Sequence, residues 1–465
     1  MAVVFESVQV ELDGGVAAAA LPLLGHADPQ RRFAWRDGQS ISVAAFLAHV
    51  DAVANRLPTS RHAVNLCEDR YAFLVAFCAC ALRGQTSLLP PSRAPQQVVE
   101  VLATHADCYA LSEATPCQSP PGLLVLPELN QPAQALSDAP PLASIAAEHV
   151  MAIGFTSGST GQPKANFKTW DNFTIGGRLN AGLLVREIGL KSDEIAHVVA
   201  TVPAQHMYGM ELSVLLPLIG PFSVHAGRPF FPSDIAGALA ELPAPRVLVT
   251  TPVHLRTLLR DATELPPIAA IVSATAPLDQ ATAIAAEQRF GAPVIEMFGS
   301  TETCVIAHRR TAQVEEWQLY DGVELHPQPD GTQVTAAHLN SPVLLQDVVE
   351  LLPGRRFRLC GRNADLLEIA GKRASLADLT RRVLSLRGVH DAIVLQTECA
   401  DGSGVQRIAA LVVAPGRCEI ELLNELRTMI DPVFLPRPLR RVTALPRNET
   451  GKLPRAALLS ALHQI

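Results

Sequence analysis

Between residues 148 and 302, short apolar runs alternate with longer segments of helical pattern, and this alternation limits the possible folds more than any other sequence feature. Such alternation is typical of βαβ units, whose strands lie parallel in a sheet. The expected strands are residues 150–156, 196–203, 246–251, 268–273 and 293–298, and the expected helices are residues 210–219, 253–260 and 278–290. We therefore predict an α/β fold with a large N-terminal domain of βαβ units and parallel sheets.

The C-terminal part of the chain differs from the rest in charge. Residues 363–465 contain 14 Lys and Arg against 11 Asp and Glu, a net charge of +3; because the whole chain carries −7, residues 1–362 carry −10. The expected elements are also shorter here: helices at 376–386 and 420–429, and strands at 391–396 and 408–413. The sequence predicts two domains, 1–362 and 363–465, of which the second is a small, mobile α+β unit joined near Arg362.

Composition excludes several classes of protein. A net charge of −7 gives no reason to expect a nucleic-acid partner. The first residues lack the pattern of a secretory signal, and the longest apolar run, residues 72–82, is too short for the roughly 20 residues of a membrane span. The nine cysteines show no zinc or iron–sulfur spacing. We expect a soluble cytoplasmic protein with no membrane span.

A loop rich in glycine and hydroxyl side chains follows the expected strand 150–156. It reads TSGSTGQPK over residues 156–164. The glycines allow a tight turn that exposes N–H groups, the hydroxyls add donors and Lys164 adds positive charge, which together suit a polyphosphate. The loop is not a Walker loop, because Gly161 is followed by Gln-Pro and not by Lys and Ser or Thr.

Three more polar strings follow expected strands, at residues 203–209, 273–277 and 298–302. In open α/β sheets, ligands bind beyond the carboxyl ends of the strands. One such string could be an ordinary turn. Because four occupy equivalent places in the predicted topology, we expect them to form one shared site.

Several of these strings resemble motifs of the adenylate-forming superfamily, which includes acyl- and aryl-CoA ligases, peptide-synthetase adenylation domains and luciferases. TSGSTGQPK is similar to its phosphate loop, FGSTE at 298–302 to its aromatic-Gly-x-Thr-Glu motif, and SATAP at 273–277 to its adenine-side segment. Residues 446–455 resemble its C-terminal catalytic-lysine motif. Its hinge motif is matched by Gly361, Arg362, Asp365 and Gly371. The resemblance covers essentially the whole chain.

The resemblance implies an AMP-forming acid–thiol ligase that activates a carboxylic acid with ATP, releases pyrophosphate and passes the acyl group to a phosphopantetheine thiol of CoA or an acyl carrier protein. Lys452 would bridge the carboxylate and the phosphate, Thr301 would donate to the α-phosphate, and Glu302 would hold Mg²⁺. His206 would border the acyl pocket. The implied nucleotide-binding residues are Thr156, Ser157, Gly158, Ser159, Thr160, Gly161 and Lys164 for the phosphates, Ser273, Ala274, Thr275, Ala276, Phe298, Gly299 and Ser300 for the adenine side, and Asp347 and Arg362 for the ribose.

In this family the small domain rotates after adenylation, which implies a pivot at Ala364 and a place for Gly371 beside the thiol tunnel. Two positions depart from the family pattern. Ala364 stands where Asp or Lys is common, and Glu368 stands where a basic residue is common. Both departures concern the rotation and leave the adenylation groups intact.

The identity of the acid depends on a narrower resemblance. The string QHMYGMELSVLLPL is similar to small stand-alone aryl-acid ligases of bacterial aryl-polyene (xanthomonadin-type) pigment pathways, which implies a hydroxybenzoate-like acid such as 4-hydroxybenzoate. A medium-chain fatty acid ligase, adenylation without thioester formation, and a non-catalytic relative that binds acyl-adenylate are the alternatives. The basic C-terminal part leaves open the docking of a separate, acidic carrier protein.

Overall fold

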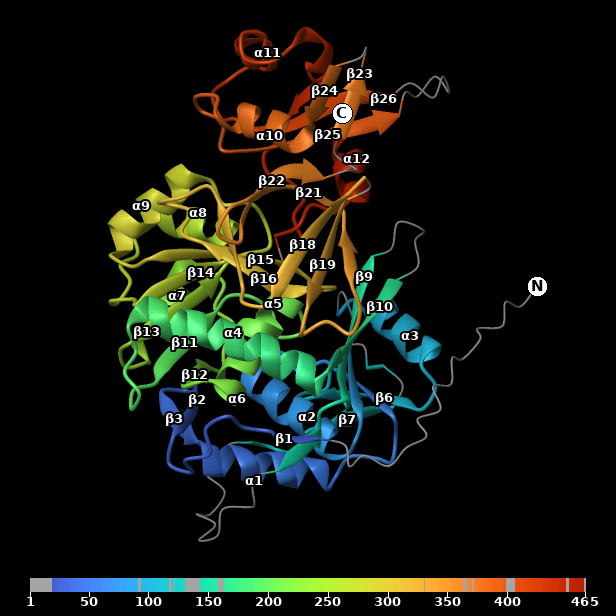
Figure 1. The fold of residues 1–465 in the computed structure, drawn as a ribbon, viewed down its shortest axis with the longest axis vertical. Helices are drawn as coiled ribbons and strands as arrows, with labels where there is room; N and C mark the ends of the chain where they lie inside the picture. Colours follow the sequence, from blue (N-terminus) through green and yellow to red (C-terminus); the bar gives the residue numbers. More distant parts are fainter. Residues whose placement is uncertain are drawn as a thin grey trace, which may run out of the picture.

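The computed structural model describes residues 19–90, 93–116, 119–120, 122–129, 143–157, 163–329, 331–362, 366–369, 372–398, 406–448 and 451–463. The chain is a mixed α/β protein with parallel sheets, so the predicted fold class is confirmed. Its C-terminal elements (orange to red in Figure 1) lie at the end of the molecule opposite helix α1 (Val43–Ala54). Within the described residues, no helix is both long and apolar enough to cross a membrane.

The larger sheet has eleven strands in the order β21-β22-β17-β16-β15-β14-β13-β11-β12-β2-β3. Its central strands, from β2 through β15, run parallel, and the others join antiparallel. Their bounds are β2 Arg32–Arg36, β3 Gln39–Ser42, β11 Ala196–Ala200, β12 Phe222–His225, β13 Arg246–Thr250, β14 Ala270–Ser273, β15 Val294–Ser300, β16 Cys304–Arg309, β17 Trp317–Leu319, β21 Asp347–Leu352 and β22 Arg356–Arg362. Strands β11, β12 and β14 are buried along their whole length, which explains why they read as continuous apolar runs.

The smaller sheet has six strands in the order β10-β9-β5-β4-β6-β7. Their bounds are β4 His62–Asn65, β5 Thr86–Leu89, β6 Cys108–Ser112, β7 Leu123–Val125, β9 Val150–Ser157 and β10 Pro163–Thr169. Strands β9 and β10 pair antiparallel, so the chain turns back after β9 and does not enter a helix. The phosphate-loop string thus begins at a strand of the smaller sheet, whereas the other three strings follow β11, β14 and β15 of the larger sheet, so the expectation that all four occupy equivalent places is wrong.

Helix α4 (Trp170–Ile188) begins directly after β10. Thr169 caps its N-terminus and forms a capping box with Asn172, while Gly189 ends the helix in the left-handed conformation. Three further helices follow strands of the larger sheet: α7 Pro232–Ala240, α8 Pro252–Arg260 and α9 Gln280–Phe290. The helices predicted at 253–260 and 278–290 are thus confirmed, with ends that differ by one or two residues.

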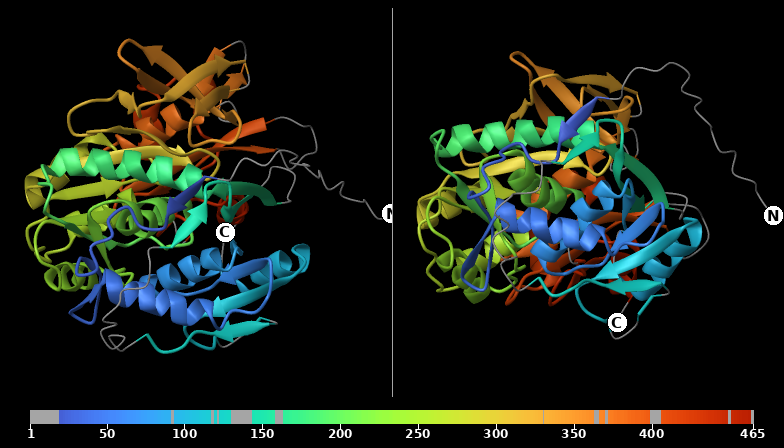
Figure 2. Two further views of the ribbon diagram at one scale, coloured as in Figure 1. Left: turned by 60° about the horizontal axis from the view of Figure 1, so that its bottom comes forward. Right: turned by 90° about the horizontal axis from the view of Figure 1, so that it is seen from below.

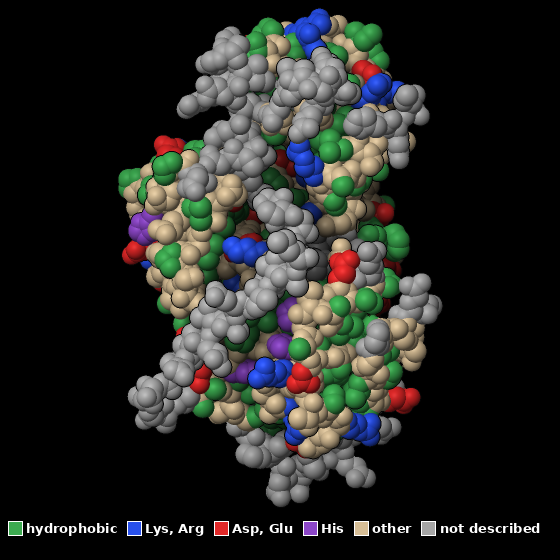
Figure 3. Space-filling view, turned by 90° about the vertical axis from the view of Figure 1, so that its right-hand side faces the viewer, with side chains coloured by type: hydrophobic (Ala, Val, Ile, Leu, Met, Phe, Trp, Pro, Cys, Tyr) green, Lys and Arg blue, Asp and Glu red, His purple; other side chains and the backbone are tan. Residues whose placement is uncertain are grey.

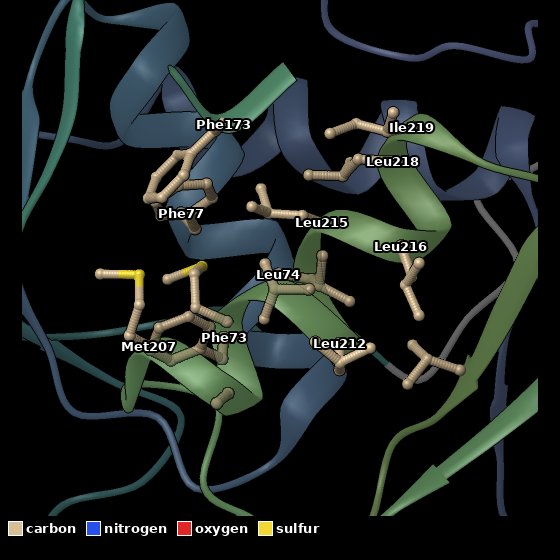
Figure 4. Close-up of a cluster of buried hydrophobic side chains, with 14 of the residues drawn as sticks. Phe73, Leu74, Phe77, Phe173, Met207, Leu212, Leu215, Leu216, Leu218 and Ile219 are labelled. Atoms are coloured by element: carbon tan, nitrogen blue, oxygen red, sulfur yellow. The ribbon is translucent and has the colours of Figure 1, made fainter. Parts of the chain in front are cut away.

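A buried apolar cluster lies among α2 (Arg70–Leu82), α4 and residues 207–219. Phe73 and Phe77 of α2 lie beside Phe173 and Met207 in Figure 4, and leucines of the 212–218 segment complete the cluster. Helix α2 also packs along α1, as Figure 2 shows. The segment that follows His206 is therefore anchored in the core.

The segment predicted as one helix at 210–219 contains two kinds of helical turn. After the short α5 (Met207–Gly209), residues Met210–Leu215 form a π-helix, η1, and Leu216–Ile219 form α6. Pro217 near the start of α6 has no N–H to donate to a regular helix. Such π-helical turns occur frequently at functional sites.

The C-terminal elements bury a hydrophobic cluster of their own, which includes Leu379, Val394, Ala410 and Leu422. They comprise β23 Leu366–Ile369, β24 Lys372–Ser375, α10 Leu376–Leu384, β25 Asp391–Glu398, β26 Gln406–Val413, α11 Glu419–Leu426, β27 Leu439–Arg441 and α12 Arg455–His463. The remaining elements are β1 Ala20–Pro22, α3 Pro95–Thr104, β8 Ser144–Ala146, β18 Val323–Gln328, β19 Gly331–Ala336, β20 Val343–Leu345 and the 3-10 turn η3 Pro432–Phe434. The division into domains 1–362 and 363–465 stays a prediction.

Candidate active site

Thr156 and Glu302 meet although they belong to different sheets. Thr156 lies near the end of β9, and its hydroxyl donates to Oε1 of Glu302 at 3.1 Å. The amide of Asn166 on β10 donates to the Thr156 hydroxyl at 3.3 Å and to the Gly154 carbonyl at 3.2 Å. Lys164, the cross-strand partner of Thr156, is exposed. The start of the 156–164 loop thus lies beside the carboxylate that the sequence assigns to magnesium.

Thr301 and Glu302 lie in the turn that joins β15 to β16. A Cβ atom at Gly154 would lie 2.9 Å from Cγ2 of Thr301, so glycine allows this turn to approach β9. Nζ of Lys168, from β10, donates to the Glu302 carbonyl at 2.6 Å. The two predicted catalytic side chains are therefore held against the strand that leads into the loop.

The adenine-side string begins at the buried end of β14. The hydroxyls of Ser273 and Thr275 are buried and have no hydrogen-bond partner within the described part of the chain. Thr275 has φ of 81°, a left-handed conformation that is strained for a β-branched residue. Ala274 is buried and Ala276 is half-buried. Two orphaned hydroxyls on a strained segment suit a site that a polar ligand completes.

Phe298 lies on the neighbouring strand, and its ring packs on Trp317 and Phe357 with centroid distances of 5.3 and 5.7 Å. Ser300 exchanges hydrogen bonds with Thr303, since its N–H donates to the Thr303 hydroxyl and its own hydroxyl accepts from the Thr303 N–H, each at 3.1 Å. Gly299 is exposed at this strand end. The FGSTE string therefore comprises the end of β15 and the start of the turn that leads to β16.

Asp347 and Arg362 are cross-strand partners at one end of the β21–β22 hairpin. The backbone carbonyl of Asp347 accepts from the Thr332 hydroxyl at 2.7 Å. The predicted ribose pair is thus brought together by strand register, although the Arg362 side chain is not among the described atoms. Their spacing of 15 residues along the sequence becomes direct adjacency in the sheet.

Lys452 lies within electrostatic range of His206, although the two are far apart in sequence. Burial, together with the positive charges of Lys452, Arg93 and Arg228, lowers the pKa of His206 to about 4. The imidazole is therefore neutral at pH 7. Figure 3 shows histidine and basic side chains together in the hollow on this face of the molecule.

The segment that carries Lys452 is closed by its own hydrogen bonds. The Lys452 N–H donates to Oδ1 of Asn448 at 2.9 Å, and the Asn448 N–H donates to the Lys452 carbonyl at 2.8 Å. Arg447 forms an ion pair with Asp391 at 2.9 Å and also donates to the Gly451 carbonyl at 2.8 Å. A Cβ at Gly451 would lie 3.6 Å from Val253 at the start of α8, so this segment packs against the rest of the protein.

Several predicted positions lie outside the described residues. They are Gly158, Ser159, Thr160 and Gly161 of the loop, and Ala364, Asp365 and Gly371 of the hinge. Ser157, Arg362 and Glu368 are described by their backbone alone. The roles of all the predicted site residues stay predictions.

Sequence analysis missed three polar residues that contact the site. Lys168 and Asn166 support Glu302 and Thr156, while Arg93 donates to the side chain of Gln205, the neighbour of His206, at 3.0 Å. Nothing in the mostly polar strand PKANFKT singles out Lys168 from its neighbours. Its partner could not be named because the contact spans 134 residues.

The donor set around Glu302 suits magnesium better than a transition metal. Within the described residues, no group of three or more His, Cys, Asp or Glu side chains could hold a metal ion. Magnesium at nucleotide sites takes one or two carboxylates and completes its shell with phosphates and water. Glu302, with the Thr156 hydroxyl beside it, fits that pattern.

Comparison with known proteins identifies relatives over most of the chain. The AMP-binding enzyme family matches residues 25–333. The chain is 29% identical over 335 residues to a 4-coumarate–CoA ligase of Halorhodospira halophila, an alignment that covers 68% of this chain and 79% of that protein. It is 24% identical over 360 residues to a 4-hydroxybenzoate–CoA/benzoate–CoA ligase of Rhodopseudomonas palustris, with 68% and 65% covered.

A solved structure shares the fold along almost the whole length. The o-succinylbenzoate CoA synthetase of Bacillus subtilis, in complex with its acyl-adenylate intermediate, superposes with a TM-score of 0.79. The superposition covers 96% of this chain and 99% of that one at 18% identity. At this level of identity, the likeness shows the fold alone.

Proposed function

The chain belongs to the AMP-binding enzyme family and is an acid–thiol ligase that activates a carboxylic acid with ATP, and from this premise we propose that its acid is a hydroxybenzoate-like aryl acid. Two relatives support this substrate class, since one is named a 4-coumarate–CoA ligase and the other a 4-hydroxybenzoate–CoA/benzoate–CoA ligase. CoA is the acceptor that the relatives' names support, and the protein works in the cytoplasm on small molecules.

The contact between Thr156 and Glu302 is the observation that supports ATP-dependent activation at this site. It joins the strand before the phosphate loop to the magnesium carboxylate at 3.1 Å. Lys452 approaches the same region from the C-terminal segment, where its charge acts on His206. Polyphosphate, metal and acid groups can therefore converge at one place.

In the first half-reaction, a carboxylate oxygen of the acid attacks the α-phosphorus of ATP, and pyrophosphate leaves with the electrons of the broken P–O bond. Both reactants are anions, so the step needs positive charge and donors near the phosphorus. Lys452 donates to the attacking carboxylate and to the α-phosphate, and Thr301 donates to the α-phosphate. Mg²⁺ held by Glu302 supplies the charge that neutralises the polyphosphate.

The nucleotide's other groups meet the remaining predicted residues. The buried hydroxyls of Ser273 and Thr275, which have no partner among the described residues, are placed to bond the adenine side. Asp347 and Arg362, paired across the hairpin, hold the ribose hydroxyls. The neutral imidazole of His206 borders the acyl pocket without adding a charge that would bind the acid's carboxylate at the wrong place.

In the second half-reaction, the thiol sulfur attacks the acyl carbon, a thioester forms, and AMP leaves. We propose that the unit 363–465 rotates about Ala364 between the two steps, so that Lys452 withdraws and the hinge face meets the thiol. Such gating builds two sites in turn from one protein. A separate carrier protein is the alternative thiol donor, and salt-sensitive transfer to a carrier but not to CoA would support it.

The substrate class is tested by ATP–pyrophosphate exchange over a panel of aryl and alkyl acids. We expect hydroxybenzoates to give the fastest exchange, followed by thioester formation when CoA is added. Faster exchange with medium-chain fatty acids would replace the aryl acid by the alternative substrate. No exchange with any acid of the panel would favour a non-catalytic relative.

The assignment of Lys452 is tested by Lys452→Ala. We expect pyrophosphate exchange to fall by about 10²–10³-fold, the typical loss when one donor to the transition state is removed. Thioester formation from preformed acyl-adenylate should remain. Arg455→Ala, which removes a nearby exposed positive charge, is the control and should exchange at the normal rate. Equal loss of both half-reactions in Lys452→Ala would contradict the division of labour.

A further inference from the structure

Three buried side chains from separate segments hold the turn between β15 and β16, which carries Thr301 and Glu302. They are Lys168, Glu211 and His338, and none is among the residues predicted to bind the nucleotide or to act in catalysis. We propose that Lys168 is a positioning residue, which fixes the backbone of Glu302 so that its carboxylate is aimed at Mg²⁺. This inference rests on the proposed function of the same site.

Lys168 reverses the usual pattern of its strand. Along β10, Phe167 is 54% exposed, whereas Lys168 is 3% exposed, so an aromatic ring faces solvent and an ammonium faces the interior. Alternate side chains of a strand face opposite sides, and burying a lysine costs several kcal/mol unless its charge is compensated. A lysine buried here without a compensating contact would therefore destabilise the folded protein.

The Lys168 ammonium donates to a carbonyl and not to a carboxylate. Its Nζ donates to the Glu302 carbonyl at 2.6 Å, and no described carboxylate lies within the 4.0 Å of an ion pair. The buried carboxylate of Glu211 is close enough to interact electrostatically with this ammonium. The ammonium therefore contacts the backbone of Glu302 and not its carboxylate, so it can fix the orientation of that peptide group.

Glu211 and His338 hold the backbone groups on the other side of the turn. Both carboxylate oxygens of Glu211, on the π-helix η1, accept from the Val305 N–H, at 3.0 and 3.1 Å. Asn180 fixes that carboxylate with a bond of 3.2 Å. Nε2 of His338 bonds to the Thr303 carbonyl at 3.0 Å. Consecutive peptides from Glu302 to Val305 are thus held from three directions.

The turn needs this support because its backbone is strained. Cys304 has φ of 58°, a left-handed conformation that costs a residue with a side chain about 1–3 kcal/mol. Without its bond to Lys168, the Glu302 carbonyl would be left unpaired, and the turn could relax. The side chain of Glu302 would then leave the position beside Thr156, and magnesium affinity would fall.

The test compares Lys168→Met with Arg31→Met. Arg31 is also a buried cation that donates to carbonyls, of Phe222 at 2.8 Å and Pro217 at 3.0 Å, but it lies outside the site. Both variants are expected to lose thermal stability. In Lys168→Met alone, the Mg²⁺ concentration for half-maximal pyrophosphate exchange should rise by about 10-fold or more, the usual effect of removing a group that orients a metal ligand.

The KM for the acid should not change in Lys168→Met, because the turn contacts the phosphate side. Unchanged Mg²⁺ dependence in Lys168→Met, or an equal shift in Arg31→Met, would overturn the inference. If Lys168→Met does not fold, Lys168→Arg takes its place, because the bulkier guanidinium of arginine would displace the contact with the Glu302 carbonyl. We expect about a 3-fold shift there, and none would overturn the inference. Absence of exchange in the unaltered protein would instead count against the proposed function.

Discussion

Gly299 has no room for a side chain at the base of the candidate site. A Cβ there would lie 2.1 Å from the Cys304 carbonyl oxygen and 2.8 Å from the Val305 Cα. Both are backbone atoms of the neighbouring strand, so neither can move alone. The glycine of the FGSTE string is therefore required by the close approach of β15 and β16, whatever ligand the site holds.

Gly299→Ala is expected to lower the free energy of unfolding by about 1–3 kcal/mol, because the new methyl group would clash with backbone atoms of the neighbouring strand. Gly176→Ala is the matched control. Gly176 lies inside α4 with nothing within 4 Å of its Cβ position, so alanine should stabilise the helix by about 0.5–1 kcal/mol. Urea denaturation measures both changes, and a neutral Gly299→Ala would show that the turn adapts.

The segment that carries Lys452 is an element without regular secondary structure. Its shape depends on Arg447, which joins the start of β25, at Asp391, to the Gly451 carbonyl. Gly451 itself has φ of 78°, which glycine adopts without strain. The lysine is thus placed by an ion pair and a turn, and not by a helix or strand.

Arg447→Ala should slow pyrophosphate exchange by about 10-fold or more, since small displacements of a reacting group cost that much or more. The KM for ATP should change less than the maximal rate, because Lys452 acts on the transition state. Arg417→Ala is the control, since Arg417 pairs with Glu421 and Glu425 on α11. If both variants slowed exchange equally, the loss would reflect the stability of the C-terminal part and not the position of Lys452.

Across the molecule, burial favours neutral side chains. It lowers the pKa of eight histidines in the described part of the chain, four of them to about 4: His197, His206, His254 and His308. Burial raises the pKa of Asp69, Glu211 and Glu296, with Glu211 at about 7. The histidines therefore stabilise the folded state above pH 6.5, and the carboxyls oppose them as pH rises toward 7.

We expect the free energy of unfolding to fall as pH is lowered from 6.5 toward 4. The unfolded histidines take up protons in that range, while the folded ones do not. His197 is 2% exposed and lies near Arg32 and Arg246, so His197→Asn should reduce the slope by up to about 1.4 kcal/mol per pH unit. Urea denaturation at several pH values measures the slope. An unchanged slope would mean that His197 titrates normally in the folded protein.

The amino-acid sequence by itself determined the fold class and most strands and helices of residues 148–302. Buried parallel strands must be apolar along their whole length, and the chain must turn after each one. Both features can therefore be recognised in short stretches of the sequence. The resemblance singled out Asp347 and Arg362, but only the register of the β21–β22 hairpin shows that they lie opposite each other.

The tertiary structure alone decided which sheet each string joins and which side chains support it. The hairpin of β9 and β10 places Thr156 in the smaller sheet, and the packing of two sheets brings it to Glu302. Nothing near Lys168 in the sequence indicates that its ammonium reaches the Glu302 carbonyl. Such contacts depend on the distance between surfaces far apart in the chain, and local patterns of hydrophobicity and turn residues do not encode that distance.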